Sequence, residues 1–518
     1  MRHARTVRFF TVPVIIIGVA ISGLFADAGG ADGNRRPVVP IRHLILFIGD
    51  GMQLAHEVAA SRYLYGADDG LEFHRFPLQG VVTTWDVNTY NYWAKRHGEP
   101  RYDPNRILPW LGYNPGEGGT RPESLQKDGA HHEPRRAYLT AVATDSASAA
   151  TAWSTGFKTD NGNIAWLSGD PADGALTTLA ERLRREKGFS IGVVSTVPFS
   201  HATPAAHVSH NVDRDNYAAI AAEILRRFQP EVVIGGGHPK WTGKYKYLSE
   251  KDYTALETDG LGETYVFVER RQGVDAAAAL LTAAETAAKS SKKLLGLFGG
   301  ADGNFESPMP VDKPGAPEVT PATRENPLLK DCVSAALTVL SRNPEGFFVL
   351  FEQGDIDWAN HANDFRRLIG TMWDLDEAVR AAVTFIERPG DDITWANTLL
   401  IVTADHGNGG MRLGEPLGIG DLPLQVKAVV SPCLSSYCDK YAYPEGNLTY
   451  ASGSHTNELV RLYAVGSGLS LFEPYQGAWY PGTRIMDNTH IFHVMASAAG
   501  LSHHCGISTV ESTPAAAK

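Results

Sequence analysis

The chain has 518 residues, with 47 basic against 58 acidic side chains, a formal net charge of -11, and 43% hydrophobic and 20% charged residues. This is the balance of an ordinary globular protein with enough apolar material for a large core. No cluster of Lys and Arg accompanies the acidic balance, which argues against nucleic acid as the natural partner, because backbone phosphates are held by clustered basic side chains.

The N-terminus has the three-part layout of a secretory signal peptide. Basic residues come first (Arg2, Arg5 and Arg8), an apolar run follows over residues 9–25, and small residues close the segment. We therefore predict a signal peptide over residues 1–28, a mature protein that is periplasmic or secreted, and no stable membrane association after cleavage. An uncleaved membrane anchor is the alternative, because the apolar run is near the lower limit for spanning a bilayer.

The four cysteines are consistent with export. Cys433 and Cys438 lie in one short polar segment, SPCLSSYCDKY, where a local disulfide is expected in an oxidising compartment. Cys332 and Cys505 can pair across the fold or stay free, and the sequence leaves both alternatives open. A zinc site made of the four is not expected, because their spacing lacks the paired CxxC form.

In chain order, strand-like apolar runs alternate with helical patterns, beginning with HLILFIG at residues 43–49. The helical patterns cover residues 176–188, 216–229, 328–343 and 364–389, and strand-like runs follow them at 189–196, 230–237, 347–354 and 397–405. The Ala-rich segment 275–296 predicts another helix. This alternation predicts an α/β fold with a central, mostly parallel sheet and helices on both faces.

Acidic residues and histidines recur where the apolar runs end. Asp50 closes the first run, Glu352 ends the run FFVLFE, and Asp405 and His406 follow TLLIVTA. In an α/β fold the carboxyl ends of the strands gather at one edge of the sheet, where such folds place their chemistry. Together these residues indicate a metal-dependent hydrolase.

The segment EQGDIDWANH strengthens the metal prediction. Asp357 and His361 are four residues apart, so a helical turn would bring both side chains to one side, as a zinc site requires. Glu352 could face a neighbouring hard cation that prefers oxygen ligands. His455, in GSHTNE, offers a further imidazole. Taken singly, each residue could equally be a helix cap or an exposed polar side chain.

Ser146 lies in the small-residue string TDSASAAT, where Thr144 or Asp145 can cap a helix. A helix N-terminus presents free N–H groups and partial positive charge to an anion such as phosphate. A serine at that point beside a divalent metal could act as a nucleophile. An ordinary start of a small-residue helix is the alternative.

Because the candidate residues run from Asp50 to His455 and must converge, we expect residues 29–518 to form a single catalytic domain with insertions. These insertions are placed at about residues 85–136, 238–270, 301–325 and 411–450. The first of them is rich in Tyr and Trp. It could line a substrate entrance, bury a dimer contact, or pack on itself.

Six motifs, in this order, make the chain resemble the alkaline phosphatases over most of its mature length: IGDGM, TDSASAATAWSTGFKTDNG, VSTVPFSHATPAAHVSHNVDR, EQGDIDWANH, TADHG and GSHTNE. The resemblance implies a three-layer sandwich of the alkaline phosphatase type. It also implies an exported, metal-dependent enzyme that hydrolyses small phosphate monoesters through a phosphoserine intermediate and releases inorganic phosphate. Ser146 would then be the nucleophile, and Arg214 would grip the non-bridging phosphoryl oxygens.

The resemblance further implies two Zn²⁺ and one Mg²⁺. Its ligand sets are Asp357, His361 and His455 for the first zinc; Asp50, Asp405 and His406 for the second; and Asp50, Thr203 and Glu352 for the third site.

Two positions depart from one common pattern of the family. His201 stands where some members have Asp, and Trp358 where others have Lys or His. An imidazole is a softer ligand than a carboxylate, which bears on the third metal, with magnesium favoured over Co²⁺ or Zn²⁺. We place both residues, with Asp145, among the side chains that surround the metal ligands.

Alternative functions share the metal residues. A phosphodiesterase of the same superfamily would usually have Thr as nucleophile and lack the arginine, so Ser146 and Arg214 argue against it. A sulfatase would need a Cys or Ser motif with Pro and Arg, which TDSASAAT does not supply. A non-catalytic exported protein that binds metal or phosphate is the third alternative. The resemblance suggests a homodimer, and the insertions leave a monomer open.

Overall fold

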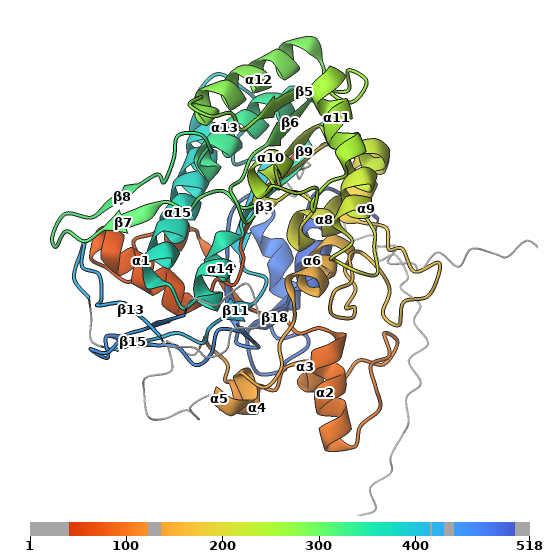
Figure 1. Ribbon diagram of the computed structural model, residues 1–518. Coiled ribbons are helices and arrows are strands. Elements are labelled where there is room, and N and C mark those ends of the chain that lie inside the picture. Colours follow the sequence, from red (N-terminus) through yellow and green to blue (C-terminus); the bar gives the residue numbers. More distant parts are fainter. Residues whose placement is uncertain (1–40, 123–135, 415–416, 429–439, 503–518) are drawn as a thin grey trace, which may run out of the picture. The chain divides into compact units, whose positions relative to one another are not determined.

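The structure is a computed structural model that describes residues 41–122, 136–414, 417–428 and 440–502 (Figure 1). The predicted signal peptide and Cys433, Cys438 and Cys505 lie outside these residues. Cys332 is described; it is buried, and it forms no disulfide with any other described residue. Among the described residues, no helix is both long and apolar enough to cross a membrane.

A ten-stranded sheet forms the centre of the fold, in the order β18-β2-β17-β10-β1-β9-β3-β4-β6-β5. Its strands are β1 (His43–Gly49), β2 (Leu78–Thr83), β3 (Ser190–Pro198), β4 (Val232–Gly236), β5 (Tyr265–Glu269), β6 (Lys293–Leu297), β9 (Phe347–Gln353), β10 (Thr398–Thr403), β17 (Val460–Gly466) and β18 (Ile485–Asp487). Only β17 runs antiparallel to its neighbours in this sheet. The prediction of a mostly parallel sheet is confirmed.

Two layers of helices cover the sheet. The helices include α1 (Leu54–Tyr65), α6 (Ser146–Thr155), α7 (Leu179–Lys187), α8 (Ala202–Val208), α9 (Tyr217–Ala222), α12 (Ala276–Ser290), α13 (Leu329–Leu340), α14 (Asp355–His361), α15 (Phe365–Glu387) and α16 (Thr489–Ala498). Helices α12, α13, α15 and α1 contact one another in that order, as do α7, α8, α6 and α16. Figure 1 shows α13 and α15 on one side of the sheet and α6 and α8 on the other. Because helices cover both faces, every residue of β1 and β9 is buried.

The helix predicted over residues 275–296 is wrong at its C-terminal end. The helix α12 ends at Ser290, and Ser291 has a left-handed backbone with φ of 55°. The following residues form β6, which pairs with β4 and β5. Ala-rich composition favours a helix only up to that turn, whereas the apolar segment Lys293–Leu297 is buried by its neighbours in the sheet. The segment 216–229 is helical as predicted, and continues after α9 as a π-helix, η3 (Glu223–Phe228).

The first predicted insertion contains α2 (Val87–His97), α3 (Pro109–Gly112) and α4 (Pro115–Gly118), and is followed by α5 (Arg136–Leu139). Its aromatic side chains form a small hydrophobic core that includes Trp85, Tyr90 and Tyr113. The same core includes Val81 of β2 and Ile485 of β18, so the described part of this segment packs against the main sheet as well as on itself. The three alternatives for its role stay open.

The other long connections carry short elements. They include α10 (Pro239–Thr242), α11 (Glu250–Asp259), the hairpin β7 (Met309–Val311) and β8 (Glu318–Thr320), and the small ladders β12 (Arg412–Leu413) with β15 (Leu448–Thr449) and β13 (Val426–Lys427) with β14 (Tyr441–Ala442). Two 3-10 segments, η1 (Glu72–Arg75) and η4 (Leu469–Tyr475), also lie in these connections. The segment 238–270 also supplies the edge strand β5 of the main sheet.

A histidine with a buried side chain, His210, joins α7 to η3. The His210 Nδ1 atom lies 3.0 Å from Glu223 Oε1, and its Nε2 atom lies 2.9 Å from the Leu176 carbonyl and 3.6 Å from Glu181 Oε2. Burial alone would lower the pKa of His210, but hydrogen bonding to Glu181 and Glu223 outweighs it and raises the pKa to about 9. Both ring nitrogens face acceptors, so the folded protein favours the imidazolium.

Replacing His210 by Asn should therefore destabilise the protein in a pH-dependent way. Because the folded-state pKa lies above the ordinary value of 6.5, the imidazolium contribution is fully present below pH 6.5 and is lost as the pH rises through about 9. The contribution at pH 6 should be about 3 kcal/mol at most. The measurement is the free energy of unfolding of both proteins at pH 6 and pH 10. Equal destabilisation at the two pH values would contradict the imidazolium assignment.

Candidate active site

Strand register brings the predicted acids to one edge of the sheet. Ile48 of β1 pairs with Glu352 of β9 and with Thr403 of β10. Asp50 follows β1 and Asp405 follows β10 at the same edge. All three carboxylates are buried, as the pattern of apolar runs ending in acids predicts.

Asp50, Asp405 and His406 form one group that could hold a metal ion. The His406 Nε2 atom lies 3.0 Å from Asp405 Oδ2 and 3.7 Å from Asp50 Oδ1. Within the described part of the chain, neither of these carboxylate oxygens has a hydrogen-bond partner. Burial, and then the charges of neighbouring carboxylates, raise the pKa of Asp50 well above its usual range. A divalent cation would satisfy these oxygens, so the group fits a metal.

A second group contains Asp357, His361 and His455. The Asp357 Oδ2 atom lies 3.1 Å from His361 Nε2, and Asp357 Oδ1 lies 3.5 Å from His455 Nε2. Asp357 and His361 come from one short helix, α14, as their spacing of four predicts. Asp357, His406 and His455 also satisfy the geometry of a metal-binding group. The two groups are therefore neighbours, with His406 close to both.

The histidines of the second group are oriented by backbone carbonyls. His361 Nδ1 lies 2.9 Å from the Gly453 carbonyl, and His455 Nδ1 lies 2.9 Å from the Thr144 carbonyl. If both Nδ1 atoms donate to these carbonyls, the two Nε2 atoms face each other as acceptors at 3.2 Å. A shared cation would relieve this contact, which is an independent sign that the residues fit a metal.

Glu352 and Thr203, which are predicted for the third site, are both fully buried. Within the described residues, Thr203 Oγ1 and Glu352 Oε1 are buried without a hydrogen-bond partner. Burial raises the pKa of Glu352 to about 7. The other oxygen of Glu352 accepts a hydrogen bond from the Ser195 hydroxyl. This all-oxygen set suits a hard cation.

Ser146 is the first residue of α6, and Asp145 caps that helix by accepting a hydrogen bond from the Ser148 N–H at 3.0 Å. The Ser146 Oγ atom lies 3.3 Å from His406 Nε2. The predicted nucleophile thus adjoins the first metal group at the positive end of a helix.

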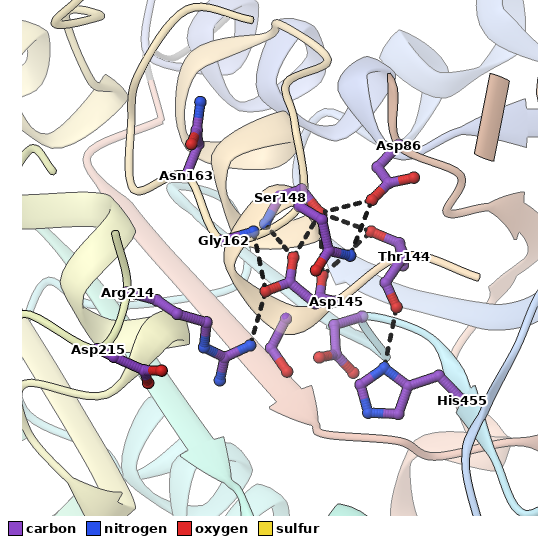
Figure 2. A network of polar contacts seen from close by, with 12 residues as sticks. Asp86, Thr144, Asp145, Ser148, Gly162, Asn163, Arg214, Asp215 and His455 are labelled. Carbon is purple, nitrogen blue, oxygen red and sulfur yellow. Dashed lines mark hydrogen bonds and ion pairs between the residues drawn. The ribbon is translucent and has the colours of Figure 1, made fainter. Parts of the chain in front are cut away.

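Arg214 approaches the same helix from another part of the chain. Its Nη1 atom donates to Asp145 Oδ2 at 2.8 Å, and the Gly162 N–H donates to the same oxygen at 3.1 Å (Figure 2). Burial alone would raise the pKa of Asp145, but Arg214 and the hydrogen bonds from Ser148 lower it to about 2. Asp145 is therefore ionised and fixes the guanidinium one residue away from Ser146.

His201 and Trp358 lie side by side, with ring centroids 6.4 Å apart, and His201 also stacks on Tyr217 at 6.0 Å. Burial lowers the pKa of His201 to about 3, so its imidazole is neutral.

Three further contacts were not predicted from the sequence. Asn408 Nδ2 donates to Asp357 Oδ1 at 2.6 Å, Ser195 bonds Glu352, and the small ladder of β11 (Gly407–Asn408) with β16 (His455–Thr456) holds His455 beside the TADHG segment. Asn408 directly follows that motif, so proximity in sequence could have indicated it. The ladder and the Ser195 contact join distant segments, and the sequence carries no local sign of them.

Comparison with known proteins gives a consistent result. The family model for alkaline phosphatase matches residues 130–428. The chain is 30% identical over 501 residues to the alkaline phosphatase of Escherichia coli (strain K12), covering 89% of this chain and 87% of that protein. It is 29% identical over 516 residues to the alkaline phosphatase of Escherichia fergusonii, covering 93% and 90%.

Solved structures show the same fold. The alkaline phosphatase from the Antarctic bacterium TAB5 matches with a TM-score of 0.55 and 21% identity, over 89% of this chain and 99% of that chain. The Thermus thermophilus alkaline phosphatase matches with a TM-score of 0.57 and 23% identity, over 90% and 92%.

Removal of divalent cations with a chelator should lower the thermal unfolding midpoint, and their return should restore it. A cation held only by the folded protein at a hundredfold excess over its Kd stabilises it by about 3 kcal/mol. Replacing Asp405 by Asn should reduce this cation-dependent gain. Asp103→Asn, which changes an exposed carboxylate outside the site, is the matched control and should keep the full gain. An Asp405→Asn protein with the full gain would show that the acids hold no metal.

Proposed function

Since the chain belongs to the alkaline phosphatase family, we propose that it hydrolyses phosphate monoesters through a phosphoserine at Ser146. The observation that supports this most strongly is the position of Ser146, 3.3 Å from His406 and next to the residue that holds Arg214. The Ser146 hydroxyl therefore lies close to the Arg214 guanidinium, which can bind phosphoryl oxygens, and to the two candidate metal groups.

Phosphoryl transfer takes place in two successive displacements, with Ser146 as the nucleophile in the first and the leaving group in the second. The Ser146 hydroxyl gives up its proton as its oxygen forms a bond to phosphorus and the ester P–O bond breaks, and the departing alkoxide takes up a proton and leaves as an alcohol. Water then attacks the phosphorus of the phosphoserine and gives up a proton, the bond from phosphorus to Ser146 breaks, the serine oxygen takes up a proton, and inorganic phosphate leaves. The N–H groups at the start of α6 present partial positive charge to the phosphoryl oxygens in both steps.

Arg214 selects the ester class. A monoester carries more terminal oxygens than a diester, and a guanidinium can donate two parallel hydrogen bonds to them. The Asp145 carboxylate, which is itself held by the Gly162 N–H, restricts where the guanidinium can lie, so less conformational freedom is lost on binding.

The metal assignment follows the donor chemistry. We assign Zn²⁺ to Asp357, His361 and His455 and to Asp50, Asp405 and His406, where imidazole and carboxylate mix, and Mg²⁺ to the oxygens of Asp50, Thr203 and Glu352. The bound ions would supply positive charge for the attacking, leaving and terminal oxygens. Magnesium stays favoured over cobalt or zinc at the third site, where neutral His201 adds no charge.

Export to the periplasm or beyond is part of the proposal. It rests on the signal-peptide pattern of residues 1–28 and on Cys433 and Cys438, which are near enough in sequence for a local disulfide. The homodimer suggested by the family remains a prediction.

The alternatives lack comparable support. A phosphodiesterase has no evident use for the Asp145–Arg214 ion pair beside the nucleophile. A protein that only binds metal or phosphate does not need a serine hydroxyl beside His406.

The test compares hydrolysis of 4-nitrophenyl phosphate with the matching diester and sulfate ester. The monoester should be strongly preferred, and Ser146→Ala should lower kcat by about 10³-fold or more while the cation-dependent gain in thermal stability persists. Ser154→Ala, which removes another buried hydroxyl from α6, is the matched control and should retain activity. Acid-quenched enzyme should carry phosphate on Ser146 by peptide mass spectrometry. Preference for the diester, or full activity of Ser146→Ala, would contradict the proposal.

A further inference from the structure

Asp86 lies at the point where the aromatic insertion begins, between β2 and α2, and its side chain is buried. Its two carboxylate oxygens have different partners. Oδ1 accepts a hydrogen bond from the Thr89 N–H at 2.7 Å and so caps α2. Oδ2 accepts from Asn161 Nδ2 at 3.1 Å and lies 3.3 Å from the Ser148 hydroxyl of α6.

Capping α2 requires only one of these oxygens. Ser, Thr or Asn would cap a helix about as well as Asp. Only a carboxylate offers a second acceptor at the position of Oδ2, because the amide of Asn would place a donor there. Burial raises the pKa of Asp86 to about 6, so the group is an acceptor at neutral and alkaline pH.

The Oδ2 atom of Asp86 is connected to Arg214 through the turn at residues 159–162. Asn161 is followed by Gly162, whose N–H donates to Asp145 Oδ2 and whose carbonyl accepts from the Arg214 N–H at 2.9 Å. Gly162 thus contacts both the backbone of Arg214 and the carboxylate that holds its guanidinium. Its φ of 89° favours glycine at this position.

The same turn is held by two further contacts from the start of α2. Val87 N–H donates to the Thr159 carbonyl at 3.0 Å, and Asn161 N–H donates to the Asn88 side chain at 2.8 Å. The Ser148 hydroxyl lies between the two carboxylates, 2.7 Å from Asp145 Oδ1 and 3.3 Å from Asp86 Oδ2, and its single proton is donated to the nearer oxygen of Asp145. Figure 2 shows Asp145 between Arg214 on one side and Ser148 and Asp86 on the other.

Neighbouring charges keep Asp86 in place. Lys158 is buried, donates to the carbonyl of Trp85 at 2.6 Å, and pairs with Asp487 at 2.9 Å. The backbone immediately before Asp86 is therefore anchored to the sheet through β18, and the carboxylate has little freedom to withdraw from Asn161.

We infer that Asp86 is a positioning residue for Arg214: through Asn161 it holds the turn whose Gly162 N–H fixes the Asp145 carboxylate beside the phosphate-binding guanidinium. The insertion is thereby part of the support of the active site. This inference rests on the role of Arg214 in the proposed function.

The test uses Asp86→Asn in the full-length enzyme. This substitution can keep the cap of α2 through Oδ1, but it sets the new amide N–H against the amide of Asn161. We expect the KM for 4-nitrophenyl phosphate and the inhibition constant of inorganic phosphate to rise about tenfold, with a smaller change in kcat. The double substitution D86N with N161D reverses donor and acceptor and should recover part of the loss.

A double-mutant cycle that combines D86N with Arg214→Ala tests whether Asp86 acts through Arg214. If Asp86 acts through Arg214, D86N should change phosphate inhibition by less than about twofold when Arg214 is already absent. Asp275→Asn is the matched control, because Asp275 caps α12 through one oxygen and should leave both constants unchanged. Asn161→Ala leaves the cap of α2 intact and provides the same test if D86N folds poorly.

Three results would overturn the inference. Phosphate inhibition could be unchanged in both D86N and N161A, which would leave Asp86 as a helix cap only. The effect of D86N could be equally large without Arg214, which would show that Asp86 acts by another route. If Arg214→Ala itself leaves phosphate inhibition unchanged, the proposed role of Arg214 fails, and this inference fails with it.

Discussion

Carboxylates buried beside one another repel and lose their hydration, so they stay ionised only where positive charge is close. Asp50, Asp405 and Glu352 are placed in this situation by the register of β1, β9 and β10, and Asp357 lies next to them at the start of α14. Histidines surround these acids, yet several of the carboxylate oxygens find no hydrogen-bond partner among the described residues. The other residues of the site surround these carboxylates, which need bound cations to stay ionised.

Rigid elements of the fold hold the acids, the serine and the histidines of the site in place. The acids stand at the ends of strands buried on both faces, and the serine stands at the N-terminus of a helix packed between α8 and α16. His361 and His455 are aimed by backbone carbonyls of the loops around Gly453 and Thr144. Groups held in this way move little when a substrate binds. Phosphoryl transfer requires such groups, because catalysis of this reaction depends mainly on positioning and electrostatic stabilisation.

The segment after β2, which the sequence predicts to be an insertion, gives local support to the site. Its aromatic side chains bury one another, and its first residues contact the turn that holds Arg214. From its sequence this segment could be an ordinary surface loop. In the structure, Asp86 near its start lies beside Asn161 and Ser148, close to the nucleophile. The contacts come from the side chains of Asp86 and Asn88 and from the Val87 N–H, so small changes at the start of α2 would alter how the guanidinium is held.

Much of this protein could be predicted from its sequence, because the informative signals are local. Apolar runs alternating with helical patterns predicted the sheet, the spacing of Asp357 and His361 predicted their shared helix, and ordered motifs predicted the family. The C-terminal end of the helix predicted over 275–296 was wrong, because burial between β4 and β5 outweighs local helix propensity. The partners of His361, His455, Asp86 and Arg214 could not be foreseen either. They are backbone groups or polar side chains from distant segments, and only the packing of the sheet, helices and insertion decides which of them meet.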